Sequence, residues 1–129
     1  MIVIDCAAVI DALSGLADTE ELRSFIVDED LHAPSLLDYE IVAAVRGMTL
    51  CGHFTSARAH DLLNDYDDLS VRIWPSVHAL RHRAFQLRDK VSACDATYVG
   101  LAEALDCPLL TRDARLARSN GHEASIVLR

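Results

Sequence analysis

Residues 2–13 read IVIDCAAVIDAL, and this stretch decides the fold class. Its opening run of apolar, β-branched residues predicts a short buried strand over residues 2–4. A helix is expected directly afterwards, over residues 6–14, because Gly15 is a typical helix terminator. The stretch lacks the basic start of a signal peptide and carries acidic residues between its apolar ones. It therefore predicts a strand that passes straight into a helix, with Asp5 at the junction.

The same succession of short strands and helices continues along the 129 residues. Further strands are expected over residues 31–33, 71–74, 108–111 and 125–128. Further helices are expected over residues 19–29, 35–50, 55–67, 77–91, 93–105 and 113–118, with Ser35 and Ser92 as N-caps. The helix over residues 77–91 follows from apolar residues at alternating spacings of three and four. Together the elements predict a single α/β domain over residues 1–129, with a mostly parallel sheet of about five strands.

Composition is that of an ordinary globular domain, with 51% hydrophobic and 25% charged residues. No apolar run reaches the roughly 20 residues needed to cross a bilayer, so we expect a cytoplasmic protein without membrane contact. The cysteines show no C-x-x-C pair and no disulfide spacing. In a reducing compartment they are expected to be small buried hydrophobic residues. They are Cys6, Cys51, Cys94 and Cys107.

The net charge of −8 is unevenly distributed along the chain. Residues 1–70 carry 14 acidic and 3 basic side chains, whereas residues 71–129 carry 6 acidic and 9 basic ones. This asymmetry allows a locally basic substrate track beside an acidic pole. The acidic half is equally consistent with a dock for a basic partner or with a solvated surface that keeps the protein in solution.

Two aspartates are expected at the carboxyl ends of parallel strands, where open α/β sheets bind ligands. Asp5 follows the first strand, and Asp113 follows the strand over residues 108–111 after one spacer. Each also stands where a helix N-cap belongs, and aspartate is a favoured N-cap. Their placement is therefore compatible with a site or with a cap.

Two further acids complete the candidate set. Asp95 lies three residues after Ser92, a spacing that also fits a capping box. Glu40 lies in the middle of a helix, on the same face as apolar Leu36, and a buried glutamate must be paired or bind a metal. Asp38 fits the start of the same helix and is not counted in the set.

If the four acids converge, each close pair repels by about 4 kcal/mol at 4 Å and an effective dielectric constant near 20. Such a cluster takes up protons or holds a cation. Ligation by carboxylate oxygens alone favours Mg²⁺ or Mn²⁺ over zinc. These ions activate water for attack on a phosphodiester and stabilise its leaving oxygen.

Basic residues that can contact a phosphate backbone lie nearby in sequence. Arg112 and Arg115 flank Asp113, and Arg81 lies on the polar side of the helix over residues 77–91. Arginine suits bidentate phosphate contacts, although a solvated helix face would look the same. Thr111 can orient a carboxylate or a water through its hydroxyl, or can be an ordinary strand residue. The histidines at positions 78 and 82 are interpreted as an exposed pair, because no H-E-x-x-H motif surrounds them.

Three stretches resemble PIN-domain nucleases and, within them, the VapC toxins of bacterial toxin–antitoxin pairs. They are IVIDCAAVIDAL, APSLLDYEIVAAVRG (residues 33–47) and DATYVGLAEALDCPLLTRD (residues 95–113). The resemblance covers essentially the whole chain and implies a three-layer α/β/α PIN fold. It implies that Asp5, Glu40, Asp95 and Asp113 form a Mg²⁺ or Mn²⁺ site that cleaves RNA, with tRNA prominent among family targets. It also implies a homodimer and a cognate VapB-like antitoxin.

The mechanism hypothesis gives these acids separate roles. Asp5, Asp95 and Asp113 ligate or orient the metal, and Glu40 is a further ligand or positions the attacking water, so that cleavage leaves a 5′-phosphate. The family often has Ser or Thr two residues after its first aspartate, where this chain has Ala7. Ala7 leaves open a second hypothesis, a PIN-like module that binds RNA or an antitoxin without useful catalysis.

A third hypothesis makes Asp5 the phospho-acceptor of a receiver-like or phosphatase-like domain. Phosphatases of that kind need a second aspartate two residues later, where this chain has Ala7. Receiver domains need a late lysine, and the only lysine, Lys90, is expected between two helices. Labelling with acetyl phosphate distinguishes this hypothesis from the nuclease.

Overall fold

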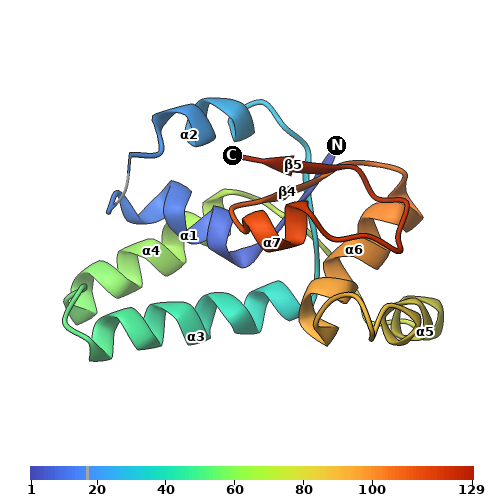
Figure 1. Cartoon of the computed structure of the whole chain (residues 1–129). Coiled ribbons are helices and arrows are strands. Elements are labelled where there is room, and N and C mark those ends of the chain that lie inside the picture. Colours follow the sequence, from blue (N-terminus) through green and yellow to red (C-terminus); the bar gives the residue numbers. More distant parts are fainter. Residues whose placement is uncertain (17) are drawn as a thin grey trace.

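A computed structural model describes residues 1–16 and 18–129 (Figure 1). Five strands form one sheet in the order β3-β2-β1-β4-β5, and every neighbouring pair is parallel. The strands are β1 (Ile2–Ile4), β2 (Leu31–Pro34), β3 (Arg72–Trp74), β4 (Leu109–Thr111) and β5 (Ile126–Leu128). The α/β fold with about five short strands expected from the sequence is confirmed, and the sheet is wholly parallel.

Seven helices flank this sheet in the described part of the chain. They are α1 (Cys6–Ser14), α2 (Glu20–Ile26), α3 (Leu36–Leu50), α4 (Ser56–Asp68), α5 (His78–Gln86), α6 (Ala93–Leu105) and α7 (Ala114–Ala117). Helix α6 packs on the central strands β1, β2 and β4, whereas α3 lies beside α4 and contacts α1 (Figure 1). Because crossovers between parallel strands are nearly always right-handed, this strand order gives a three-layer α/β/α arrangement. None of the described helices is both long and apolar enough to span a membrane.

The hydrophobic core is centred on the two innermost strands. All residues of β1 and β4 are buried, and Val3, Leu109 and Leu110 have no exposed surface. Such continuous apolar strands are typical of parallel sheets covered on both faces. Close packing around β1 and β4 fixes the positions at which these two strands end.

The strand order reverses direction at the junction of β1 and β4. From β1 the chain proceeds to β2 on one side, and from β4 it proceeds to β5 on the other. In open α/β sheets, a crevice forms outside the carboxyl ends of the strands at such a point. Asp5 directly follows β1, and its backbone N–H donates to the Leu110 carbonyl at 3.2 Å. The fold therefore places the ends of two central strands beside one crevice.

Several local expectations differ from the structure. Helix α5 ends at Gln86 instead of residue 91, because Leu87 and Arg88 bond to carbonyls three residues back and tighten the chain into turns. Helix α2 covers only seven residues of the expected 19–29. Ser35 adopts helical backbone angles, and its side chain makes no capping bond. All cysteines are free, but none is fully buried as expected: Cys51 and Cys94 are exposed, and Cys6 and Cys107 are half-buried.

Candidate functional site

Asp5 is the single residue between the end of β1 and the start of α1, and both of its carboxylate oxygens accept hydrogen bonds. Its Oδ1 accepts the Ala8 backbone N–H at 2.9 Å, so Asp5 is a true N-cap of α1. Its Oδ2 accepts the Thr111 hydroxyl at 2.5 Å. Only 9% of Asp5 is exposed, and this burial raises its pKa despite the two hydrogen bonds. The negative charges of Asp95 and Glu40 raise the pKa further, so these three acids share one neighbourhood.

Thr111 joins the ends of β1 and β4. It is fully buried, donates its hydroxyl to Asp5, and accepts the Asp113 backbone N–H at 3.0 Å. Ala7 offers no hydroxyl to its neighbours, but Asp5 receives one from Thr111 instead. A Ser or Thr at position 7 of α1 would help to orient this carboxylate. In this chain the hydroxyl of Thr111, on β4, orients it instead.

Glu40 lies half-buried on α3 and is held by a residue of α6. The Tyr98 hydroxyl donates to Glu40 Oε1 at 2.5 Å, and Tyr98 is only 2% exposed. Burial raises the pKa of Tyr98 far above its ordinary value, and the hydrogen bond to Glu40 adds to this effect. Sequence reasoning missed Tyr98. Its signal is a tyrosine at the start of an apolar run over residues 98–102, since a buried tyrosine hydroxyl needs a partner.

The remaining two acids lie at helix starts and line one cavity. Asp95 is half-buried in the first turn of α6, where its N–H donates to the Ser92 hydroxyl at 3.2 Å. Asp113 caps α7, and the Arg115 backbone N–H followed by the Arg115 guanidinium holds its pKa below the ordinary range. The cavity has a volume of about 350 Å³ and is also bordered by Lys90. Both aspartates thus serve as helix-start residues and also face a common space.

The predicted basic residues lie in different settings. Arg115 is exposed beside Asp113 and borders the cavity. Arg112 pairs with Asp11 at 2.9 Å and donates to the Arg129 carbonyl at 2.8 Å. Arg81 donates to the Ser76 carbonyl and hydroxyl, both at 3.1 Å. Arg115 is therefore the predicted arginine that the structure brings to the acids, together with Lys90.

The donor set fits a hydrated hard cation. Carboxylate oxygens are the ligands that Mg²⁺ prefers, and this ion commonly binds through one or two carboxylates while keeping several waters. That mode suits these acids, because the described residues contain no group of three side chains close enough to hold one ion directly. Burial raises the pKa of the neighbouring Cys6 thiol to about 12. Oxygen donors such as these carboxylates are the ligands that Mg²⁺ and Mn²⁺ prefer in proteins.

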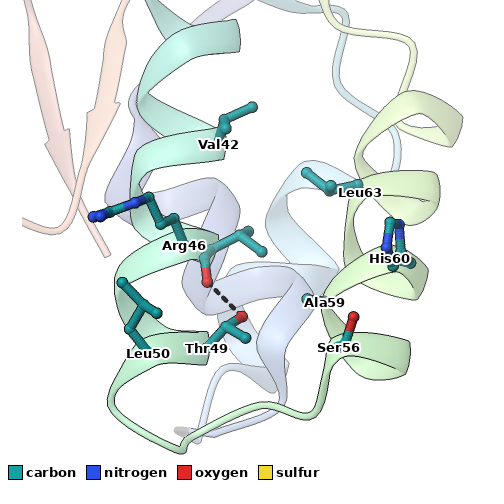
Figure 2. Close-up of a pocket in the computed structure, with 9 residues that line it drawn as sticks. Val42, Arg46, Thr49, Leu50, Ser56, Ala59, His60 and Leu63 are labelled. Carbon is teal, nitrogen blue, oxygen red and sulfur yellow. Dashed lines mark hydrogen bonds between the residues drawn. The ribbon is translucent and has the colours of Figure 1, made fainter.

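A separate groove lies between α3 and α4, with a volume of about 250 Å³ (Figure 2). Val42 and Leu63 extend toward one another from its two walls, and Leu50 lies near its end. Val42 is 56% exposed and Leu50 is 70% exposed. Val42 and Leu50 thus form an exposed apolar face on α3, the helix that also carries Glu40.

Comparison with known proteins gives a consistent result. Residues 2–121 match the family model described as PIN domain. The chain is 36% identical to ribonuclease VapC12 of Mycobacterium tuberculosis, over 99% of this chain and 98% of that protein. It is 39% identical to ribonuclease VapC1 of the same organism, over 98% of this chain and 96% of that protein.

Solved structures share the fold at lower sequence identity. The protein PAE2754 from Pyrobaculum aerophilum superposes with a TM-score of 0.74 at 19% identity, over 97% of this chain and 81% of that chain. VapBC2 from Rickettsia felis, solved bound to a promoter DNA fragment, gives a TM-score of 0.70 at 14% identity, over 98% of both chains.

Proposed function

The chain belongs to the PIN-domain family as a ribonuclease of the VapC toxin type, and we propose that Asp5, Glu40, Asp95 and Asp113 form its Mg²⁺- or Mn²⁺-dependent catalytic site. The observation that carries this proposal is the setting of Asp5. It is a buried carboxylate at the meeting point of β1 and β4, and its pKa is raised by burial and by two further acids. A divalent cation would compensate this concentration of negative charge.

The acids have distinct roles in the proposed reaction. Asp5, Asp95 and Asp113 would ligate or orient the ion, directly or through water, and the ion supplies Lewis acidity and acidifies water when bound. Thr111 keeps Asp5 in one orientation through its hydroxyl. Glu40 accepts Tyr98 at Oε1, so its other oxygen is available as a further ligand or to position the attacking water. In-line attack by this water on the phosphodiester would break the bond between phosphorus and the 3′-oxygen, leaving a 5′-phosphate and a 3′-hydroxyl, with a proton of the water ending on the 3′-oxygen.

The proposed substrate is RNA, with structured RNA such as tRNA as the first candidate. Arg115 and Lys90 border the same cavity as Asp95 and Asp113, so they are placed to contact phosphates beside the acids. Arg112 and Arg81 remain candidate contacts farther along a bound strand. A guanidinium has five N–H donors, and the present hydrogen bonds of Arg112 and Arg81 use only some of them. Both side chains therefore retain donors for a phosphate.

We also propose two protein partners. The first is a VapB-like antitoxin, because an acidic site attracts a basic side chain from an inhibitory segment and the Rickettsia felis neighbour is a VapBC pair. The second is another copy of this chain, bound through the apolar face of Val42 and Leu50 between α3 and α4. Cytoplasmic location is proposed with them, since the RNA substrate resides there.

Cleavage assays with purified protein test the proposed function. Total RNA and tRNA are incubated with wild type and Asp5→Asn, each with Mg²⁺, Mn²⁺ or EDTA, and product ends are mapped. We expect cleavage by wild type with either ion, 5′-phosphate ends, no cleavage in EDTA, and a rate lower by at least about 100-fold in Asp5→Asn. Equal cleavage in EDTA, or by a folded Asp5→Asn variant, contradicts the proposal. RNA binding by wild type without cleavage would instead support the binding-module hypothesis.

A further inference from the structure

The hydrogen bond between Tyr98 and Glu40 joins two helices that otherwise pack on different neighbours. Helix α3 packs mainly against α4 and α1, whereas α6 packs mainly against α5, β1 and β2. The two residues are 58 positions apart in sequence, and their oxygens lie 2.5 Å apart. A short bond from a hydroxyl to a carboxylate is among the strong hydrogen bonds of proteins. It therefore fixes the carboxylate of one helix against the body of the other.

Packing alone does not account for a tyrosine at this position. Tyr98 is 2% exposed, and a phenylalanine would fill the same volume without a polar atom to satisfy. The hydroxyl contacts Glu40, and Tyr98 lies three residues after Asp95 on α6, so both residues are on the same side of that helix. A tyrosine hydroxyl, with an ordinary pKa of about 10, is protonated at neutral pH and remains a donor.

We propose that Tyr98 is a positioning residue, whose hydroxyl holds Glu40 Oε1 and thereby sets the orientation of the second carboxylate oxygen at the acidic site. This inference rests on the proposed function of Glu40 and adds a residue that acts only through it. A half-buried glutamate can adopt many rotamers. The hydrogen bond from Tyr98 disfavours most of them, which raises the fraction of molecules whose Glu40 carboxylate is correctly placed. Tyr98 would thus affect the rate more than substrate affinity.

The chain offers a matched control for this hydrogen bond. Tyr66 on α4 donates its hydroxyl to Asp38 of α3 at 2.7 Å, so it also joins a tyrosine to a carboxylate of α3. Asp38 is exposed, and it is not among the charges that raise the pKa of Asp5. Tyr66→Phe therefore removes a similar bond to the same helix at a carboxylate that is not one of the four acids.

The test compares wild type with Tyr98→Phe, Tyr66→Phe and Glu40→Gln. For each we measure kcat and KM for RNA, Mn²⁺ affinity of the RNA-free protein by calorimetry, and the melting temperature, with all assays well below the lowest melting point. We expect kcat of Tyr98→Phe to fall about 10- to 100-fold, with KM within about twofold and weakened Mn²⁺ binding. Tyr66→Phe should keep wild-type values. Incorporation of 3-fluorotyrosine at position 98 restores the hydroxyl and should restore the rate.

Three results would overturn the inference or its premise. Wild-type kcat and Mn²⁺ affinity in Tyr98→Phe, while Glu40→Gln is inactive, would remove the role of Tyr98 but leave the proposed function intact. Equal decreases of kcat in Tyr98→Phe and Tyr66→Phe, each in proportion to the decrease in melting temperature, would show that the Tyr98 bond has only a structural role. A fully active Glu40→Gln would contradict the proposed function itself.

Discussion

Asp5 makes a structural hydrogen bond with each of its carboxylate oxygens. One of its oxygens caps α1 through Ala8, and the other is held by Thr111 of β4. A cap and a site were alternative interpretations of this aspartate at the level of sequence; the structure shows the cap, and the role of Asp5 in a site stays a prediction. Burial raises its pKa, so the ionised form costs folding free energy at neutral pH.

Replacement of Asp5 by Asn should therefore separate stability from activity. Asn keeps an oxygen for the Ala8 N–H but removes a charge that the neighbouring acids repel. We expect the melting temperature of metal-free Asp5→Asn to equal or exceed that of wild type, and Mg²⁺ to raise the melting temperature of wild type only. Asp11→Asn, which removes an acid of the same helix that pairs with Arg112, is the control and should retain activity. A large loss of stability in Asp5→Asn, with no Mg²⁺ effect in wild type, would contradict this account.

The four candidate acids could be identified from the sequence, but the residue that holds Glu40 could not. Asp5 and Asp113 could be placed because they follow short apolar runs, and parallel strands end at a common edge. Tyr98 could not be assigned to Glu40, because a periodic pattern shows which helix face is apolar but not which distant residue meets a buried hydroxyl. That pairing depends on how α3 and α6 are placed by the sheet between them.

At the scale of elements, most of the order of strands and helices could be predicted, whereas several ends could not. The strands are short runs of apolar residues bounded by polar ones, which is a strong local signal. The end of α5 depends instead on turn bonds at Leu87 and Arg88, although apolar spacing continues to Val91. Leu87 is 1% exposed, so its side chain satisfies the apolar pattern from a turn as well as it would from a helix.

The contact between α5 and α6 includes an ion pair with a defined pH dependence. Arg83 on α5 forms two hydrogen bonds to Glu103 on α6, at 2.8 and 2.9 Å. The Arg83 guanidinium, more than any other group, holds the pKa of Glu103 below its ordinary value. Because the pKa of Glu103 is lower in the folded state, its ionised form adds to the free energy of unfolding at pH values above the unfolded-state pKa, near 4.5. This contribution is lost as the pH falls through the pKa of the folded state.

Glu103→Gln should therefore lose about 1 kcal/mol of unfolding free energy at pH 7, as expected for a partly buried, charge-assisted pair. The difference from wild type should shrink below pH 4.5 and vanish at lower pH, because the wild-type carboxyl is then protonated. Urea unfolding at a series of pH values measures this difference. Glu123→Gln, an exposed acid near the same pair, provides the control. A difference independent of pH would show that the pair acts through packing alone.

At the scale of the whole molecule, the charge asymmetry and the apolar face of α3 and α4 have separate consequences. The acidic half of the chain contributes Asp5 and Glu40, whereas the basic half contributes Arg115 and Lys90, which border one cavity with Asp95 and Asp113. The proposed cation site and the proposed phosphate contacts thus come from different halves of the chain. The apolar groove between α3 and α4 is a separate feature. Its exposed side chains Val42 and Leu50 are the observation that favours an interface there.

Leu50→Glu should weaken the proposed homodimer, because it places a charge in an apolar face that a second copy would cover. We expect a shift from dimer toward monomer in sedimentation velocity, with unchanged circular dichroism. Val27→Glu is the control, since Val27 is 73% exposed and follows α2, away from the groove. Identical sedimentation of Leu50→Glu and wild type as dimers would place the interface elsewhere.

The proposal that the acids bordering Asp5 make the catalytic site distinguishes two neighbouring acids of α3. Glu40 and Asp38 each accept a tyrosine hydroxyl, but only Glu40 raises the pKa of Asp5. The decisive measurement is the single-turnover rate of Mg²⁺-dependent RNA cleavage by Glu40→Gln and Asp38→Asn. We predict a loss of at least about 100-fold in Glu40→Gln and a rate within about twofold of wild type in Asp38→Asn. An undiminished rate in Glu40→Gln, or equal losses in both variants, would contradict the claim.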